Sequence, residues 1–418
     1  MNSSMDILII LAFFSEVILL ALLEKKMWGT IYTPLNIVML PTAVIVLICL
    51  WIINQFDLYP FYAPCLFVWM VGLFFFAIPS MLFRKLTDGT VQVSEMSISE
   101  LPAPKLVFWA GIIVCLLFLY HMSSAMSNTS SAVGSDAFAD EVSTHGVWAH
   151  VFCLVMFSNI LSLLYISKKR WYFILLLLLG LVVCVINQVK SWVLIPLFAG
   201  ILLNIFTGRI HLSWRLLLFV ALGGTSFFFL SYYLSLVVSV DKELSDNVVF
   251  FIFKNFAHYL TSGILGLSMD MDRGIVETQD VGYLFTIFVN IYNVIVGEPI
   301  KSVVNPHFLG TTWPTLGTNV RSIMGTAYIF AGPWLFPVII LFVSSAAYFI
   351  RMKLVRTRSL SWLLVDGWMC AILAMAWFDW DFFHLRVYEV FILCGFSPLA
   401  IRFLFPDKEP INVEPQPT

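Results

Sequence analysis

A small number of ionisable residues stand at the edges of long apolar stretches, where they are candidates for chemistry. Burying a charge at membrane depth is costly, so such residues usually have a function. Arg321 directly precedes an apolar stretch, and Asn319 and Ser322 beside it add neutral hydrogen-bonding groups. A guanidinium can bind a phosphate through two parallel hydrogen bonds, and it stays charged at any working pH. The alternative role of Arg321 is to anchor the chain at the membrane interface.

Lys190 and Ser191 form a second candidate, in the short turn INQVKSW between two apolar stretches. A lysine, a hydroxyl and the free N–H groups of a starting helix together favour an anion. The alternative is a lysine whose ammonium group only reaches the interface.

The third candidate is the segment WFDWDFFHLRVYEVF. Arg386 and Glu389 are three residues apart, so they can share a helix face, either as part of a site or as a structural ion pair. Asp379, Asp381 and His384 precede them. Carboxylate and imidazole groups beside a cation can perform general acid–base chemistry.

Weaker candidates lie between residues 240 and 322, where His258, Arg273 and His307 stand. A lone histidine is more often structural. Two Asp-x-Asp patterns, Asp270/Asp272 and Asp379/Asp381, offer oxygen ligands, but two carboxylates alone are a weak signal for a divalent cation. The sequence therefore predicts no metal site. It also lacks nucleotide-binding motifs, H-E-x-x-H and G-x-S-x-G, and we expect no cofactor.

The elements that position these residues are membrane helices. Of the 418 residues, 60% are hydrophobic and only 11% are charged, whereas soluble domains are about a quarter charged. The net charge of −2 gives no sign of nucleic-acid binding. With spans of about 20 residues, the sequence predicts an all-α polytopic protein with about 11 transmembrane helices. They lie at 5–23, 34–54, 60–83, 104–122, 147–167, 171–187, 191–206, 214–239, 323–350, 358–378 and 383–404.

The distribution of Lys and Arg predicts the orientation, because these residues concentrate in alternate short loops, which are then cytoplasmic. The N-terminus and a long loop, 240–322, are then outside and the C-terminus inside. The loop contains apolar segments at 248–267 and 281–296, which we expect to be in-plane or re-entrant helices. As an extra pair of spans they would raise the count to 13. The expected organisation is about eight spans in 1–239, the loop, three spans in 323–404, and a disordered cytoplasmic tail, 405–418.

Two segments resemble a known family. GTNVRSIMGTAYIFAGPWLFPVIILF and INQVKSWVLIPLFAGILL are similar to segments of bacterial oligosaccharide repeat-unit polymerases, the Wzy-type O-antigen and capsule polymerases. The arrangement of many spans with a long loop between late ones is also similar. The chain departs from the pattern at YIFAG, where many members carry an acidic residue.

This resemblance implies a GT-C-like membrane glycosyltransferase in the bacterial inner membrane. Such an enzyme transfers a growing glycan from undecaprenyl pyrophosphate to a new lipid-linked repeat unit at the periplasmic face. No metal or nucleotide is expected. The expected partners are the lipid-linked oligosaccharide, membrane lipid and possible chain-length regulator and flippase proteins, with no nucleic acid.

The resemblance also suggests roles for the candidate residues. Fixed cations would stabilise the leaving pyrophosphate, and a base would take the proton of the acceptor hydroxyl. The expected pyrophosphate-binding residues are Lys190, Ser191, Arg321, Arg273 and Arg386. The expected catalytic residues are His307, His384 and Asp381. Asn319, His258 and Glu389 are further site candidates.

Two other functions stay open. A lipid-linked glycan flippase or another transporter would carry ionisable residues near the bilayer midplane. Here the cations gather at one face, and the acidic residues identified within the spans are Glu16 and Glu389. An O-antigen ligase-like transferase would share the polymerase chemistry and differ in its acceptor.

Overall fold

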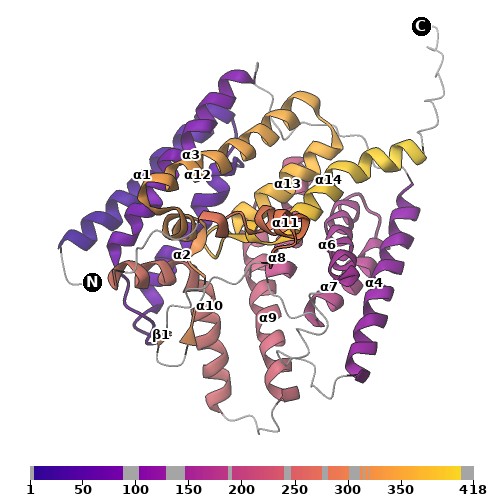
Figure 1. The fold of residues 1–418 in the computed structure, drawn as a ribbon, viewed down its shortest axis with the longest axis horizontal. Helices are drawn as coiled ribbons and strands as arrows, with labels where there is room; N and C mark the ends of the chain where they lie inside the picture. The colour runs from indigo at the N-terminus through magenta and orange to yellow at the C-terminus, as the bar shows by residue number, and fades with distance from the viewer. Residues whose placement is uncertain are drawn as a thin grey trace.

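Helices make up nearly all of the computed structural model (Figure 1). The structure describes residues 4–87, 103–128, 146–186, 191–239, 246–274, 281–300, 311–313, 316–318 and 320–405. Three predicted site residues, Lys190, His307 and Asn319, lie outside the described residues, as does the predicted tail beyond residue 405.

The helices follow the apolar stretches of the sequence closely. They are α1 (Ser4–Trp28), α2 (Pro34–Ile52), η1 (Ala63–Cys65), α3 (Leu66–Leu86), α4 (Pro104–Asn128), α6 (Val147–Ile166), α7 (Phe173–Ile186), α8 (Ser191–Phe206), α9 (Trp214–Ser239), α10 (Asp246–Asp272), η3 (Val281–Tyr283), α11 (Thr286–Val296), α12 (Ser322–Thr357), α13 (Leu360–Ala374), η4 (Asp381–Phe383) and α14 (Leu385–Leu404). The two strands are β1 (Thr311–Trp313) and β2 (Leu316–Gly317), which pair antiparallel. The all-α class is confirmed, and this small hairpin is an addition that the sequence did not predict.

Within the described residues, seven helical segments are long and apolar enough to cross a membrane. They belong to α1, α2, η1 with α3, α4, α6, α12 and α14. The other four predicted spans contain the apolar helices α7, α8, α9 and α13, whose apolar described parts are shorter. A 14-residue helix such as α7 is about 21 Å long, less than the roughly 30 Å hydrocarbon layer. The chain is thus a helical membrane protein, and its number of spans stays a prediction.

The helices form two groups joined by a central layer (Figure 1). In one group α3 packs along α12 and α1, and in the other α6 packs on α7 and α4. Between them, α13 contacts both α8 and α14, and α8 also packs on α6. Because α13 contacts α12 of the first group directly and reaches α6 of the second through α8 and α14, the loops at its two ends lie where many helices meet.

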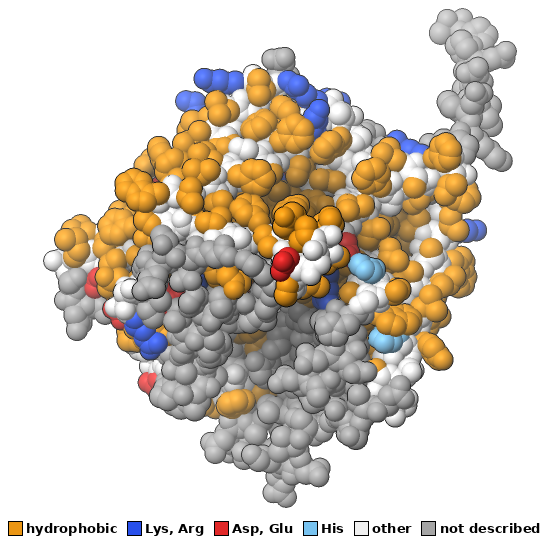
Figure 2. Space-filling model, in the orientation of Figure 1, with side chains coloured by type: hydrophobic (Ala, Val, Ile, Leu, Met, Phe, Trp, Pro, Cys, Tyr) orange, Lys and Arg blue, Asp and Glu red, His pale blue; other side chains and the backbone are white. Residues whose placement is uncertain are grey.

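Basic residues mark one end of this bundle. The last turns of α1, α3, α12 and α14 each carry Lys or Arg, namely Lys25, Lys26, Arg84, Lys85, Arg356 and Arg402. Figure 2 shows Lys and Arg along the upper edge of the molecule, above a broad hydrophobic surface. Cations at helix C-termini also interact favourably with the helix dipole.

Helix α12 is broken in its first half. Gly332 has φ 69° and ψ 172°, which is non-helical, and Pro333 follows it. Glycine tolerates this positive φ, and proline removes a backbone donor, so the sequence Gly-Pro explains the break. The short segment before it begins at Ser322, directly after Arg321, and contains Thr326.

The described parts of the long loop predicted for 240–322 contain α10, η3, α11 and the β1–β2 hairpin. The second half of α10 is buried, and α10 packs on α2, α9 and α12. Helix α11 instead exposes most of its apolar side chains, including Phe288, Ile291 and Ile295. The helical nature of both segments is confirmed, and their placement in the plane of a membrane stays a prediction.

Candidate functional site

The connection between α13 and α14 is tied to the start of α12. The backbone N–H of Ser322 donates to the Phe378 carbonyl at 2.9 Å, and that of Ile323 donates to the Ala376 carbonyl at 2.7 Å. Ser322 has a positive φ of 63°. These bonds satisfy N–H groups that a helix start leaves without intrahelical partners. They also hold Arg321 and Asp379 in neighbouring positions.

Two glycines of α10 bring this region together. A Cβ on Gly263 would lie 2.3 Å from the carbonyl oxygens of Trp377 and Phe378. A Cβ on Gly266 would lie 2.2 Å from the carbonyl oxygen of Val320. Residues three apart share a helix face, so one bare stripe of α10 admits both connecting segments. The same face continues to Asp270, seven residues after Gly263.

Arg321 and Asp270 form a buried ion pair. The Arg321 Nε donates to Asp270 Oδ2, and the two side chains are 2% and 1% exposed. Two charges this far from water need each other, because either alone would be strongly destabilising. The pair therefore joins α10 to the start of α12. From the sequence, Asp270 was noted only as one member of an Asp-x-Asp pattern. In the structure its partner is Arg321, 51 residues further along the chain.

The carboxyl group of Asp379 lies next to this pair. It accepts a hydrogen bond from the Thr326 hydroxyl at 3.3 Å. Burial raises the pKa of Asp379 to about 6, while the backbone N–H of Trp380, Thr326 and the Arg321 charge partly oppose the rise. A carboxyl group with a pKa near the working pH is well suited to take and return a proton.

Asp381 and His384 have different environments on the same connection. Burial and the neighbouring Asp379 raise the pKa of Asp381 well above its usual range. Its Oδ2 has no hydrogen-bond partner among the described residues. Burial and the nearby Arg386 lower the pKa of His384 to about 4. These shifts favour the protonated form of Asp381, which cannot accept a proton, and the uncharged form of His384, which is a weak base. Asp379 is therefore the best suited of the three to accept a proton.

A second cluster surrounds the start of α14. The His384 ring contacts the edge of Trp192, with centroids 5.1 Å apart. The Arg386 guanidinium lies 5.3 Å from the centre of the Phe152 ring and 6.0 Å from that of Trp192. These distances suit cation–π contacts. Arg386 is half-buried, unlike Arg321, and so is Ser191, which begins α8 just before Trp192.

Glu389 extends this cluster to α6. Its carboxylate lies 2.8 Å from His150 Nδ1 and accepts the Cys153 thiol at 2.9 Å. His150 was not a predicted site residue, since nothing in its local sequence indicates its distant partner. Figure 2 shows cationic, acidic and histidine side chains close together on the front face, beside the region of α11.

The other predicted residues lie elsewhere. His258 is buried on α10, four residues before Ser262. Arg273 is exposed beyond the end of α10, with its guanidinium 5.4 Å from the centre of the Tyr59 ring. Asp272 accepts the Tyr59 hydroxyl at 2.6 Å, so Asp270 and Asp272 have different partners. Among the described residues, no group of three His, Cys, Asp or Glu side chains could hold a metal ion.

A buried polar network near the basic ends of the helices was missed by the sequence analysis. Arg351 Nε donates to Asp366 Oδ1 at 2.9 Å, and its Nη1 donates to the Tyr32 carbonyl at 2.8 Å. Nearby, Glu24 accepts hydrogen bonds from the hydroxyl groups of Tyr348, at 2.9 Å, and Ser80. Glu24 of α1 and Asp366 of α13 are thus further acidic residues within apolar helices, in addition to the predicted Glu16 and Glu389. The sequence signal that could have identified Asp366 is a charged residue inside a predicted apolar span.

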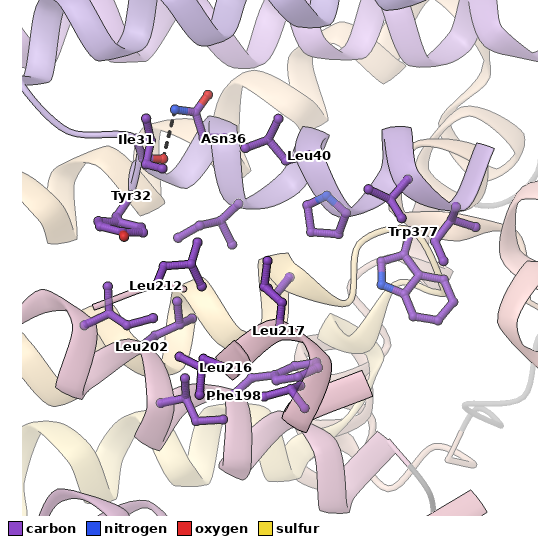
Figure 3. A pocket seen from close by; sticks show the side chains of 18 residues that line it. Ile31, Tyr32, Asn36, Leu40, Phe198, Leu202, Leu212, Leu216, Leu217 and Trp377 are labelled. Carbon is purple, nitrogen blue, oxygen red and sulfur yellow. Dashed lines mark hydrogen bonds between the residues drawn. The ribbon is translucent and has the colours of Figure 1, made fainter. Parts of the chain in front are cut away.

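An apolar groove of about 500 Å³ runs between α2, α8 and α9 (Figure 3). Its 18 lining residues include Tyr32 and Asn36 near one end and Trp377 at the other. Trp377 immediately precedes Phe378 and Asp379. The groove therefore extends from the neighbourhood of the Arg351 network to the neighbourhood of the α13–α14 connection.

Comparison with known families identifies one match. The model of a family of unknown function, DUF6337, matches residues 57–400. This chain belongs to that family. The matched part begins just before η1 and ends within α14, so it includes every described residue that was predicted as a site residue, whereas Glu24 and the groove-lining residues between 31 and 45 precede it. No curated protein and no solved structure matches this member of DUF6337.

Proposed function

We propose that this protein is a membrane glycosyltransferase that polymerises lipid-linked oligosaccharide repeat units. Its donor is a growing glycan on undecaprenyl pyrophosphate, and its acceptor is a hydroxyl group of a new lipid-linked unit. The proposal includes a GT-C-like fold, a bacterial inner-membrane location and a site on the periplasmic side. It rests on the sequence resemblance together with the chemistry of the α13–α14 connection.

The observation that carries the proposal is that a half-buried cation and a carboxyl group with a raised pKa stand close together in the sequence around one connection. Arg386 stands at the start of α14 beside Trp192, close to the N-terminal end of α8. Asp379 stands seven residues earlier with a pKa of about 6. The cation and the α8 terminus favour an anion, and the carboxyl group can accept a proton. Lys190, directly before α8, would add a second cation.

The proposed reaction needs both features. The acceptor oxygen attacks the anomeric carbon of the donor glycan, and the bond from that carbon to the pyrophosphate oxygen breaks. The proton of the acceptor hydroxyl passes to Asp379. Negative charge grows on the leaving pyrophosphate, and fixed cations in a poorly hydrated site stabilise it most in the transition state. Arg386 has the exposure needed for direct contact.

Arg321 has a different role in this proposal. Its side chain is almost fully buried and already engages Asp270. It therefore acts as a positioning residue, which fixes the start of α12 and with it Asp379. Its loss would disturb the site without removing a contact to the pyrophosphate.

The test is deletion of the gene with complementation, reading surface polysaccharide as a ladder on a gel. The complementing proteins are wild type, Arg386→Ala, Asp379→Asn and Lys190→Ala, with exposed Lys26→Ala as the control. Membrane levels of each protein are measured in parallel. We expect single-repeat glycans in the deletion, rescue by wild type and the control, and poor rescue by the other variants. An unchanged ladder in the deletion, in a strain with no second polymerase, contradicts the proposal.

The orientation has its own test. All seven native cysteines are buried, so a cysteine introduced at Ser131 gives a labelling signal over a low background. The proposal expects Ser131→Cys to react with an impermeant thiol reagent in cells with an opened outer membrane and an intact inner membrane. Reaction only after the inner membrane is permeabilised would reverse the orientation.

A second candidate function is transport of a lipid-linked glycan. The buried Arg351, Asp366 and Glu24 network favours it, because ionisable residues within membrane helices often mark transport pathways. The same deletion separates the two functions. Loss of all surface glycan, including single repeats, indicates a flippase or an earlier step, and single repeats that persist indicate a polymerase.

A further inference from the structure

We infer that the groove between α2, α8 and α9 holds the polyprenyl tail of the lipid-linked substrate, with the tail's phosphorylated end at Trp377. This inference rests on the proposed function, since it assigns a binding place to part of that substrate. The groove is formed by helices that are distant in the sequence, and no sequence motif indicates its lining.

The lining of the groove excludes a polar ligand. Asn36 and Tyr32 contribute polar side chains near one end, and the other side chains are hydrocarbon, proline or tryptophan. Asn36 Nδ2 already donates to the Ile31 carbonyl at 2.9 Å. A sugar in this groove would lose its hydrogen bonds to water and gain almost none, which is costly for each hydroxyl group. A hydrocarbon chain has no such cost.

The walls are open toward the bilayer. Leu40 and Val44 of α2 are 39% and 53% exposed, and Leu217 of α9 is 55% exposed. These residues line the groove and also belong to the outer surface of apolar helices. A lipid chain can therefore enter sideways between α2 and α9, without crossing the interior of the protein.

The length and position of the groove fit a tail whose head group is at the proposed site. From Asn36 to Ile45 the lining follows α2 for about 14 Å, at 1.5 Å per residue, and Tyr32 extends it beyond the start of the helix. Its volume of about 500 Å³ is within the range of ligand sites, about 300–1,000 Å³. Figure 3 shows Tyr32 and Trp377 at opposite ends.

Continuity with the site favours the substrate tail over a surrounding phospholipid. Trp377 is half-buried, and its carbonyl oxygen faces Gly263 of α10. The next carbonyl, of Phe378, accepts the Ser322 N–H, and Asp379 follows. A lipid seated here has its phosphorylated end next to the α13–α14 connection, where the proposed transfer takes place.

The experiment uses the full-length protein in lipid nanodiscs and a sugar-free polyprenyl pyrophosphate with a diazirine on an isoprene unit near the pyrophosphate. Cross-linked residues are located by mass spectrometry, and the dissociation constant is measured with the same probe. The test variant is Leu40→Trp, which fills the groove. The matched control is Leu47→Trp, since Leu47 is on the same helix, is 54% exposed and does not line the groove. A second pair is Leu217→Trp with Leu218→Trp on α9.

Because the diazirine is close to the pyrophosphate, we expect cross-links to groove-lining residues at the Trp377 end. Filling it should weaken binding about tenfold, the loss expected when about two methylene groups leave an apolar site. The controls should bind as wild type does. Equal binding by Leu40→Trp and Leu47→Trp, cross-links mainly elsewhere, or displacement of the probe by excess phosphatidylglycerol would each overturn the inference.

The result is separable from the proposed function. Groove cross-links in a protein whose deletion leaves the polysaccharide ladder unchanged would support the groove and contradict the polymerase. A ladder that depends on the protein but is unaffected by Leu40→Trp, with no groove cross-links, would do the reverse.

Discussion

The close approach of α10 to the site makes a specific prediction for Gly266→Ala. The new Cβ would lie 2.2 Å from the Val320 carbonyl oxygen, whereas ordinary contact begins near 3.4 Å. The two segments must therefore separate by about 1.2 Å, the difference between these distances. Neither is a flexible side chain that can rotate away. Overpacking of this kind costs about 1–3 kcal/mol, and the movement also displaces Arg321 from its partner on α10.

The matched control is Gly224→Ala on α9, where no atom lies within 4 Å of the added Cβ. Alanine is favoured over glycine in a helix by about 0.8–1.0 kcal/mol, so this variant should be as stable as wild type or more stable. The chemical change is the same at both positions. A difference of sign between them thus reports the contact with the Val320 carbonyl and not the loss of a glycine.

Thermal unfolding of the purified variants in one detergent measures the effect. We expect a lower Tm for Gly266→Ala, and for Gly263→Ala by the same reasoning, with an unchanged or higher Tm for Gly224→Ala. Polysaccharide ladders from cells should show reduced polymer for the α10 variants at equal membrane levels. Equal Tm values for Gly266→Ala and Gly224→Ala would refute the close packing of α10 on the segment before α12.

Three further predictions concern the buried charges. Asp270→Asn should lower the free energy of unfolding by about 3–5 kcal/mol, because Arg321 remains buried without its anion. In a double-mutant cycle, adding Arg321→Gln should recover much of this loss. Additive effects of the two substitutions would contradict the pairing. Burial raises the pKa of Asp379 to about 6, so the protonated form favours folding and this contribution to stability is lost as pH rises through about 6. Polymer formation that uses Asp379 as a base should instead increase over that range. Asp379→Asn should remove the activity and reduce the pH dependence of the Tm near 6, to which Asp270 also contributes because burial raises its pKa to about 6 as well. Arg351→Gln should lower the free energy of unfolding by about 3–5 kcal/mol, because Asp366 then stays buried without its partner. Adding Asp366→Asn should recover part of this loss. If thermal unfolding shows no recovery in the double variant, the two residues do not act as a pair.

The sequence alone determined where the helices form. Each of the eleven predicted stretches contains a helix, because an apolar run in a hydrocarbon environment must satisfy its backbone hydrogen bonds internally. The end of the longest helix differs from the prediction: the predicted span is 323–350, whereas α12 continues to Thr357. Its last turns carry charged residues, so hydropathy ends before the helix does.

The sequence also located the α13–α14 connection as chemically unusual, because it gathers Asp379, Asp381, His384 and Arg386 within eight residues. Nearness in sequence could not decide which of these groups acts as a base. That depends on the burial of each carboxyl group and on the groups beside it, which for Asp379 include Thr326 and Arg321 at the start of α12.

Only the tertiary structure decided the partners. Arg321 was a candidate ligand by its position, yet Asp270 of α10 buries and neutralises it. Glu389 interacts electrostatically with Arg386 on its own helix, and the tertiary structure adds His150 of α6 as a second partner. The groove combines lining residues of α2 with lining residues of α8 and α9 that lie more than 150 residues further along the chain. Hydropathy and motif spacing are local quantities, whereas a pairing or a groove depends on which faces of distant helices meet, and that is settled by packing of the whole bundle.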